Sequence, residues 1–211
     1  MIPLFAALIS ANTLQAQNAG NDFLIRRVEI DSLPNPAGPA IQGANSDPSI
    51  GRNWVKVLVQ FDSQPARDAK VINEEKFTPE VEVKYYVGIE SPTKKADGKK
   101  GLECYDMLTG GQTLIDVFDG QGHNSMAFLH PNVVRRYGGE SRFTSKQTCF
   151  VFVEILVGGI VKDSFCNDKK MMSDLSWKNQ IAPVTGLILN KNQTPWQPAA
   201  WDALNMIKPV Q

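Results

Sequence analysis

The sequence predicts an all-β fold in which two antiparallel sheets pack face to face as a β-sandwich. Apolar and polar residues alternate most clearly over residues 81–89, the pattern of a sheet with one wet face. Residues 149–157 are almost continuously apolar and precede Gly158-Gly159, which predicts a central strand ending in a two-residue hairpin turn. No helical pattern separates the strands, so a doubly wound parallel sheet is excluded.

Short segments of strand-like alternation recur along the chain, each bounded by turn residues. The predicted strands are 23–30, 54–61, 79–89, 102–108, 113–118, 125–129, 133–137, 149–157, 160–166 and 184–189. Turns are expected at 109–112 and 119–122, and a Lys-rich hairpin tip at Asp97-Gly98. The Pro- and Gly-rich stretch 33–51 is the longest predicted loop, because its prolines cannot donate ladder hydrogen bonds.

A short C-terminal helix is expected over residues 198–207. Ala200, Ala203, Leu204 and Ile207 follow helical spacing, and Pro198 stands at the start, where proline is tolerated. With 211 residues, of which 42% are hydrophobic, the chain can fill the core of one sandwich domain with long loops.

The N-terminus has the pattern of an export signal. Residues 2–9 form an uncharged apolar run and residues 10–17 are polar, an order that predicts cleavage after Ala16. A signal usually begins with Lys or Arg, and Met1 leads straight into the apolar run, so we expect the native signal to start further upstream. The predicted division is a signal peptide at 1–16, a flexible tail at 17–22 and the sandwich domain at 23–211; the alternative is a buried N-terminal strand.

The three cysteines, Cys104, Cys149 and Cys166, permit one disulfide and leave one thiol over. If Val157 pairs with Ile160, Cys149 and Cys166 share one face of the hairpin as diagonal neighbours. That spacing is long for a disulfide unless a bulge shifts the register. Pairing of Cys104 with either of them, or three buried thiols, are the alternatives. No CxxC motif or Cys/His cluster indicates zinc.

Charge and motifs exclude several functional classes. Lys plus Arg equals Asp plus Glu at 22 each, so the formal net charge gives no reason to bind nucleic acid. The two histidines, His123 and His130, lie outside any GxSxG, P-loop or HExxH motif. The turn with Asp119 and Asn124 lacks the acidic ligands of a calcium loop. We therefore predict no catalytic residue, no metal site and no cofactor.

Aromatic side chains are the best binding candidates. Trp177, Trp196 and Trp201 gather near the C-terminus, and flat rings can stack on sugars or anchor a protein interface. Trp196, between Pro195 and Gln197 and outside any periodic pattern, is the strongest of the three. The alternative is that these rings cover the sandwich core.

Residues 23–30, 54–62 and 81–89 resemble a family of small secreted proteins encoded in a type IV pilus-like gene cluster of a mucin-degrading gut bacterium. The resemblance extends over the whole mature chain and implies an immunoglobulin-like sandwich, linked to pilus assembly or adhesion at the cell envelope. It brings no catalytic or cofactor residues. A pilin has a long apolar helix after its signal, whereas the apolar run here ends at Ile9, so polymerisation through such a helix is not expected.

The leading hypothesis is a non-catalytic protein, exported to the periplasm, outer membrane or cell surface, that contacts pilus-cluster or envelope proteins. Self-association is a further partner hypothesis, because near-zero net charge removes the repulsion that opposes it. The alternative function is a carbohydrate-binding module for host or mucin glycans, based on the tryptophans. An enzyme that acts through His123 or His130 is the third hypothesis and the one with least support in the sequence.

Overall fold

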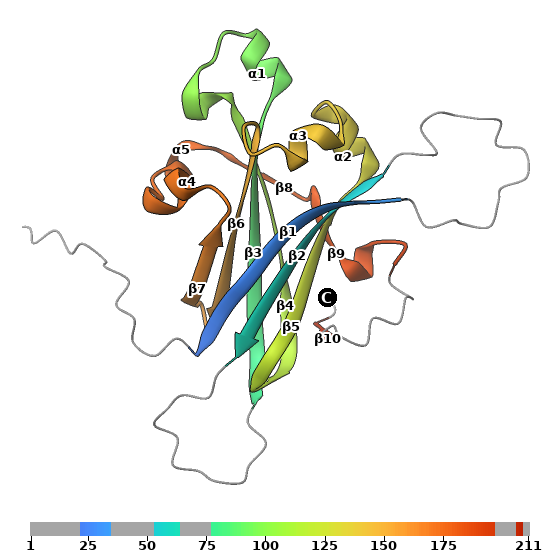
Figure 1. The fold of residues 1–211 in the computed structure, drawn as a ribbon, viewed down its shortest axis with the longest axis vertical. Helices are drawn as coiled ribbons and strands as arrows, with labels where there is room; N and C mark the ends of the chain where they lie inside the picture. Colours follow the sequence, from blue (N-terminus) through green and yellow to red (C-terminus); the bar gives the residue numbers. More distant parts are fainter. Residues whose placement is uncertain (1–21, 35–52, 64–76, 197–205, 209–211) are drawn as a thin grey trace, which may run out of the picture.

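The computed structural model describes residues 22–34, 53–63, 77–196 and 206–208, which form two packed β-sheets with short helices gathered mainly at one end (Figure 1). The predicted β-sandwich is confirmed. The predicted signal at 1–16, the tail up to residue 21 and most of the loop at 33–51 lie outside the described residues.

Sheet A has the strand order β1-β2-β5-β9, with antiparallel neighbours throughout. Its strands are β1 (Phe23–Leu33), β2 (Trp54–Ser63), β5 (Gly120–Leu129) and β9 (Ile188–Asn190). The strands predicted at 23–30, 54–61 and 125–129 therefore all belong to one sheet.

Sheet B has the order β10-β4-β3-β6-β7. Its strands are β3 (Phe77–Glu90), β4 (Tyr105–Phe118), β6 (Cys149–Val157), β7 (Ile160–Cys166) and β10 (Met206–Ile207), and β8 (Pro183–Thr185) also joins β4. The β4–β8 pair is parallel, which is the exception to the predicted antiparallel order. Because β3 occupies one side of β4, β8 and β10 share its other side.

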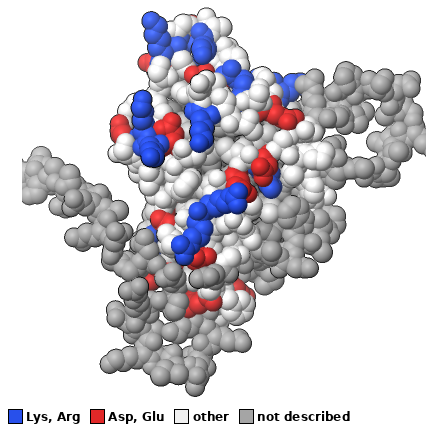
Figure 2. Space-filling view, viewed as in Figure 1, with Lys and Arg blue, Asp and Glu red and all other residues white. Residues whose placement is uncertain are grey.

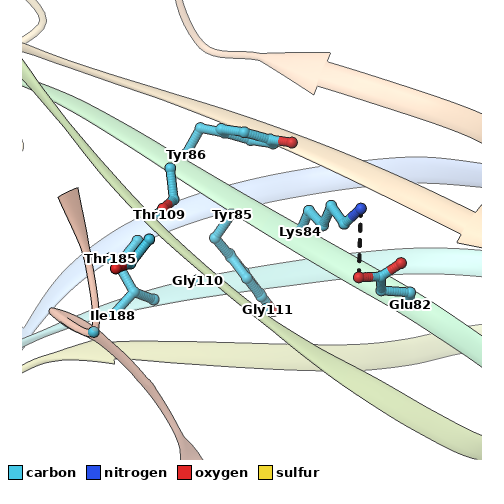
Figure 3. Close-up of a pocket in the computed structure, with 10 residues that line it drawn as sticks. Glu82, Lys84, Tyr85, Tyr86, Thr109, Gly110, Gly111, Thr185 and Ile188 are labelled. Atoms are coloured by element: carbon cyan, nitrogen blue, oxygen red, sulfur yellow. Dashed lines mark ion pairs between the residues drawn. The ribbon is translucent and has the colours of Figure 1, made fainter. Parts of the chain in front are cut away.

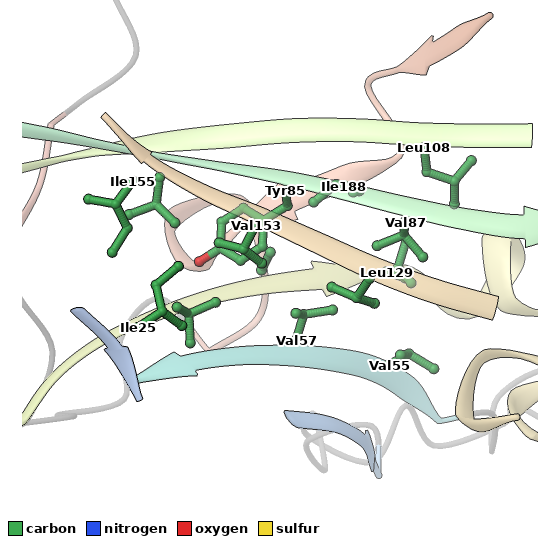
Figure 4. Packing of buried hydrophobic residues seen from close by; sticks show 14 of the residues in the cluster. Ile25, Val55, Val57, Tyr85, Val87, Leu108, Leu129, Val153, Ile155 and Ile188 are labelled. Atoms are coloured by element: carbon green, nitrogen blue, oxygen red, sulfur yellow. The ribbon is translucent and has the colours of Figure 1, made fainter. Parts of the chain in front are cut away.

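The main core fills the space between the two sheets, where side chains of β2 and β5 meet those of β3, β4 and β6 (Figure 4). Alternate residues of β3 are at most 1% exposed, as their alternation predicted; they are Val81, Val83, Tyr85, Val87 and Ile89. Burial of each large aliphatic side chain stabilises the fold by about 1.5–3 kcal/mol.

Two smaller apolar clusters cover the outer faces of the sheets. Outside sheet B lie Met107, Phe150, Phe152, Cys166, Trp177 and Ile181; outside sheet A lie Trp54, Leu58, Met126 and Phe128. Strand β6 lies between β3 and β7 and contributes to both the main core and the outer cluster of sheet B. The prediction of a central strand covered on both sides is thus confirmed.

The helices are all short. They are α1 (Pro92–Ala96), η1 (Gly101–Cys104), α2 (Pro131–Arg136), α3 (Glu140–Thr144), α4 (Lys169–Ser173), α5 (Trp177–Gln180) and η2 (Lys191–Gln193). In the described ranges, none of them has the length and apolar character needed to cross a membrane. The predicted tip at Asp97-Gly98 does link antiparallel neighbours, but the connection contains α1 and η1.

The strand predicted at 133–137 is wrong, because these residues belong mainly to α2. Pro131 occupies the first turn of this helix, where a missing N–H costs nothing. The His130 side chain precedes it and accepts a hydrogen bond from Asn132 N at 3.1 Å. These start signals outweigh the strand preference of Val133 and Val134.

Strand β4 is continuous where the sequence predicted two strands and a turn. Gly110 and Gly111 lie inside it and pair with Tyr85 and Lys84 of β3, so the turn predicted at 109–112 is wrong. The strand predicted at 102–108 is only partly correct, because its first residues belong to the helix η1. The turn predicted at 119–122 is shorter than expected, since β5 already begins at Gly120.

The β6–β7 hairpin forms at Gly158-Gly159 as predicted, with Val157 opposite Ile160. The register then shifts by one residue, so Cys166 faces Phe152 instead of residue 151. Cys149 belongs to the main core and Cys166 to the outer cluster. The predicted sharing of one face is therefore wrong, because the bulge places the two cysteines on opposite faces of sheet B.

The C-terminal region alternates between the sheets. The strand predicted at 184–189 divides into β8 in sheet B and β9 in sheet A, and the chain turns at Gly186, where φ is 78°. Of the helix predicted at 198–207, residues 198–205 lie outside the described part. Met206 and Ile207 form a strand that pairs with β4, so the helix does not extend to them.

Candidate functional site

A shallow groove of about 320 Å³ lies on sheet B where β3, β4 and the β8–β9 connection meet (Figure 3). It is lined by Glu82, Lys84, Tyr85, Tyr86, Thr109, Gly110, Gly111, Thr185, Gly186 and Ile188. On β3, Tyr85 points into the sandwich, so Lys84 and Tyr86 point to the outer face, together with their β4 partners Gly111 and Thr109. The groove thus opens on the outer face of the sheet.

Gly110 and Gly111 line the groove because neighbouring atoms come too close for side chains, on the inner face of β4 at Gly110 and on its outer face at Gly111. A Cβ at Gly110 would stand 2.7 Å from Ile188 Cβ and 3.0 Å from its carbonyl oxygen. A Cβ at Gly111 would stand 3.2 Å from Val83 O, a tight contact that the neighbouring strand can relieve by a small shift. Glycine inside a strand often marks such a close approach and leaves a hollow beside larger neighbours.

The hydrogen-bond ladder on the outer edge of β4 has a gap at Gly111. Strand β8 pairs with β4 up to Thr109, and β10 pairs with it at Leu114 and Ile115. Lys208 N donates to Thr113 O at 2.7 Å, so Thr113 directs its backbone groups to this edge. Gly111, two residues earlier, directs its N–H and C=O the same way. No strand in the described part of the chain pairs with it there.

Tyr86 forms one wall of the groove, and Glu154 and Lys178 fix its position. Its hydroxyl donates to Glu154 Oε2 at 2.9 Å, and Lys178 Nζ lies 2.5 Å from Glu154 Oε1 and 5.1 Å from the Tyr86 ring centre. Burial and the Glu154 carboxylate together raise the pKa of the Tyr86 phenol above its ordinary value. The ring is therefore a fixed, neutral surface rather than an acid or base.

The predicted tryptophan site is not assembled in the described structure. Trp177 is 1% exposed, and its indole N–H donates to Met171 O at 2.8 Å, so it anchors α5 on sheet B. Trp196 is half-buried, stacks on Phe128 at 5.3 Å and meets Trp54 edge-on at 5.0 Å on the outer face of sheet A. Trp201 lies outside the described residues.

His123 lies beside a serine, but the direction of their hydrogen bond does not suit catalysis. Its Nε2 lies 3.1 Å from the hydroxyl of Ser63, which is 2% exposed. That hydroxyl donates its single hydrogen to Phe118 O at 2.7 Å and accepts from Gly120 N at 3.2 Å. The ring nitrogen must then be the donor to Ser63, whereas a general base would accept the serine proton. The pair fastens the β4–β5 turn.

His130 is also structural. Its ring caps α2 and packs edge-on against Trp54 with 4.8 Å between ring centres. Asn124 of β5 also has a structural role, since its Oδ1 accepts from Gln60 Nε2 of β2 at 3.2 Å. Across the described ranges, no three His, Cys, Asp or Glu side chains converge as a metal site would require.

The three cysteines are buried and unpaired in the structure. Burial raises the pKa of the Cys149 thiol to about 12 and that of Cys166 to about 11. Since the thiolate is the reactive form, neither is suited to act as a nucleophile at neutral pH. Cys104 donates to Lys99 O at 2.8 Å and lies at the end of η1.

Charges on the visible face alternate in sign. Figure 2 shows Lys and Arg side chains beside Asp and Glu side chains along β1 and β2. The ion pairs there are Arg26–Asp62, Arg27–Glu29 and Lys56–Asp31. Alternating charges of this kind produce no broad field of one sign to attract a polyanion.

The chain matches a known protein family. The family model aligns with residues 14–211, almost the whole chain. The chain belongs to this family. It is not a known enzyme family. No curated protein sequence matches the chain.

One similar solved structure is a crystal structure of a protein from Akkermansia muciniphila, with a TM-score of 0.67 and 16% sequence identity. The match covers 90% of this chain and 93% of that chain. At this identity the likeness shows the fold, and it agrees with the two-sheet architecture described above. That protein comes from a mucin-degrading gut bacterium, as does the family that the sequence resembles.

Proposed function

We propose that this protein is a non-catalytic envelope protein that acts through contacts with other proteins of a type IV pilus-like system, in assembly or adhesion. The proposal places it after export in the periplasm, the outer membrane or at the cell surface. It is supported by the resemblance to a pilus-cluster family and by the use of the serine, histidine and cysteine side chains described above for structure alone.

The observation that carries the proposal is a set of exposed apolar side chains at one end of sheet B. The exposed fractions are 49% for Phe77, 53% for Phe118, 66% for Ile160 and 47% for Val161. We call this set the apolar end. Since β3 and β6 are antiparallel, with Glu82 opposite Leu156, the start of β3 and the β6–β7 turn lie at the same end.

Such a surface is suited to a protein partner. The Phe77 and Phe118 rings lie 6.1 Å apart, and exposed apolar side chains that gather in this way often mark interaction sites. Strand β7, which carries Ile160 and Val161, has a bulge and also carries Lys162, features that oppose the addition of another strand to its edge. We therefore expect the partner to pack on the side chains of the apolar end.

Two experiments test the role. Deletion of the gene should alter surface fibres, adhesion or envelope composition, and unchanged cells would contradict the proposal. Crosslinking in the native cell should capture pilus-cluster or envelope proteins. The double variant Ile160→Lys/Val161→Lys should lose that capture, while Leu175→Lys, at a 40% exposed position away from the apolar end, should retain it.

A carbohydrate-binding module built on tryptophans has less support. Trp177 is buried in the outer cluster of sheet B, and Trp196 packs on Phe128. A sugar platform needs an open ring face, which Trp177 lacks.

A further inference from the structure

The groove over Gly111 presents an unusual combination of backbone and side-chain groups. Its floor offers one peptide N–H and one C=O at the gap between β8 and β10. Its walls carry the hydroxyls of Thr109 and Thr185, which have no hydrogen-bond partner within the described structure. A ligand that fits must therefore bring both donors and acceptors to a small area.

The charged side chains of the groove cancel each other. Lys84 Nζ lies 3.5 Å from Glu82 Oε1, and both side chains remain about two-fifths exposed, at 38% and 40% (Figure 3). The pair can donate to and accept from hydroxyl groups without selecting a net charge. This favours a neutral polar ligand over a phosphate or a carboxylate.

Tyr86 adds an apolar surface. Because its hydroxyl is held by Glu154, the ring is fixed in place and presents carbon atoms to the groove. Aromatic carbon packs against the C–H groups of a sugar ring, whose hydroxyls then remain available for the polar walls. The volume of about 320 Å³ is near the lower limit of small-molecule sites, which is roughly 300 Å³.

The geometry of the gap disfavours a peptide strand. An extended chain would pair with β4 at Gly111 alone, since β8 and β10 occupy the edge on either side. A compact group with one N–H and one C=O is not hindered by β8 and β10 in this way. An acetamido substituent on a sugar is such a group.

We propose that the groove binds a neutral pyranose that carries an acetamido group, an N-acetylhexosamine exposed at the end of a glycan. The acetamido group pairs with the backbone of Gly111, the ring packs on Tyr86, and the hydroxyls bind Thr109, Thr185 and the Glu82–Lys84 pair. This site is separate from the tryptophans and does not depend on the assembly role proposed above.

The test is an NMR titration of the full chain with N-acetylglucosamine, N-acetylgalactosamine and glucose. An N-acetylhexosamine should shift the amide signals of Thr109, Gly111 and Thr185, and glucose should bind at least about tenfold more weakly, as expected when an amide pairing is lost. Equal binding of glucose would overturn the acetamido assignment. No shifts with any sugar at tens of millimolar would overturn the site.

Variants separate binding from folding. Gly111→Ala adds one methyl to the floor and should weaken binding at least about tenfold, and Thr185→Val should weaken it several-fold. Thr93→Val, on exposed α1, is the matched control and should bind like the parent. Undiminished binding by Gly111→Ala, with its fold verified by the same spectra, would contradict the proposal.

Two further titrations test for other ligands and separate the two proposals. If a short extended peptide shifts the same signals and the sugars do not, the saccharide assignment is wrong. The Ile160→Lys/Val161→Lys variant should bind the sugar normally, because neither residue lines the groove. Loss of crosslinked partners without loss of sugar binding would thus separate the two proposals.

Discussion

At the scale of single residues, polar side chains inside the sandwich join the two sheets. Tyr85 of sheet B lies 2.6 Å from Ser125 Oγ of sheet A, and both are 1% exposed. Gln112 of β4 is itself buried, and its amide oxygen accepts a hydrogen bond from the Ser125 hydroxyl. Burial raises the pKa of the Tyr85 phenol far above its ordinary value, so the group stays a neutral donor. Such a network is stabilising only while every member is satisfied.

Removal of one hydroxyl from this network should therefore be costly. We expect Tyr85→Phe to lower the free energy of unfolding by about 1–3 kcal/mol, because Ser125 loses a buried partner. Urea unfolding at neutral pH measures the change. Tyr105→Phe is the control, since no partner of the half-buried Tyr105 hydroxyl is found in the described residues, and it should change stability little. Equal stability of the two variants would contradict the role of the network.

Asp62 makes the stability of the fold depend on pH in the acid range. Burial alone would raise its pKa, but the hydrogen bond from Arg26 Nε at 2.5 Å and that from Gly122 N at 3.1 Å outweigh burial and hold the pKa below the ordinary 3.8. A carboxyl whose pKa is lower in the folded state contributes stability that is fully present at pH values above its pKa in the unfolded state. That contribution is lost as the pH falls through its pKa in the folded state.

The expected result is a loss of stability below about pH 4 that depends on Asp62. Asp62→Asn should be less stable than the parent at neutral pH, and the difference should narrow as the pH falls towards 2. Urea unfolding at a series of pH values measures this. A constant difference across the range would show that the carboxylate charge does not contribute.

At the scale of elements, side chains close both open sides of the sandwich. On one side, Asp163 of β7 accepts a hydrogen bond from Ile25 N of β1 at 2.7 Å. On the other, the Gln112 amide, in the orientation that satisfies both of its ends, donates to Met126 O and accepts from Met126 N, each at 3.2 Å. Strands β1 and β5 of sheet A thus each find a partner in a side chain of sheet B.

Loss of the Asp163 contact should open the β1 edge locally. We expect Asp163→Ala to raise the hydrogen-exchange rate of the Ile25 amide by about tenfold, since about 1.5 kcal/mol of a charge-assisted hydrogen bond is lost. Lys162→Ala, which removes only the partly exposed pair with Asp22, is the control and should leave the rate nearly unchanged. An unchanged Ile25 rate in Asp163→Ala would contradict the closure.

The two glycine pairs explain which elements could be predicted from the sequence. Gly158 and Gly159 have φ values of 58° and 78°, a local need for glycine that a hairpin signal reveals. Gly110 and Gly111 sit in extended strand, and glycine is required at Gly110 because Ile188 approaches from a distant segment. The first case is local, and the sequence predicts its turn correctly, whereas the second depends on tertiary contacts, and the turn that the sequence predicts there does not form.

The candidate groove escaped prediction for the same reason. Its residues are threonines, glycines and a tyrosine of ordinary appearance, brought together from β3, β4 and the β8–β9 connection. The tryptophans are more conspicuous in the sequence and predict a binding site, but Trp177 is buried in the outer cluster of sheet B. The available signal was Gly110-Gly111 between two apolar alternating segments, since glycine inside a strand often marks a close approach of backbone or ligand.

At the scale of the whole molecule, three apolar clusters share the same strands. Strand β6 carries Val151 and Val153 into the main core and Phe150 and Phe152 into the outer cluster of sheet B. Strand β2 links the main core to the outer cluster of sheet A in the same way, through Val57 and Leu58. A cluster cannot lose its packing without disturbing a strand that the others need.

This sharing predicts a single cooperative unfolding transition. Trp177 belongs to the outer cluster of sheet B, and Trp54 to that of sheet A. We expect Trp177→Ala to lower the free energy of unfolding by about 3–5 kcal/mol, the usual cost of removing a buried tryptophan. The fluorescence of the remaining tryptophans should then follow the lowered midpoint measured by circular dichroism, because both outer clusters depend on the same core. If the fluorescence transition stays at the parent midpoint while circular dichroism shifts, the sheets unfold as separate units.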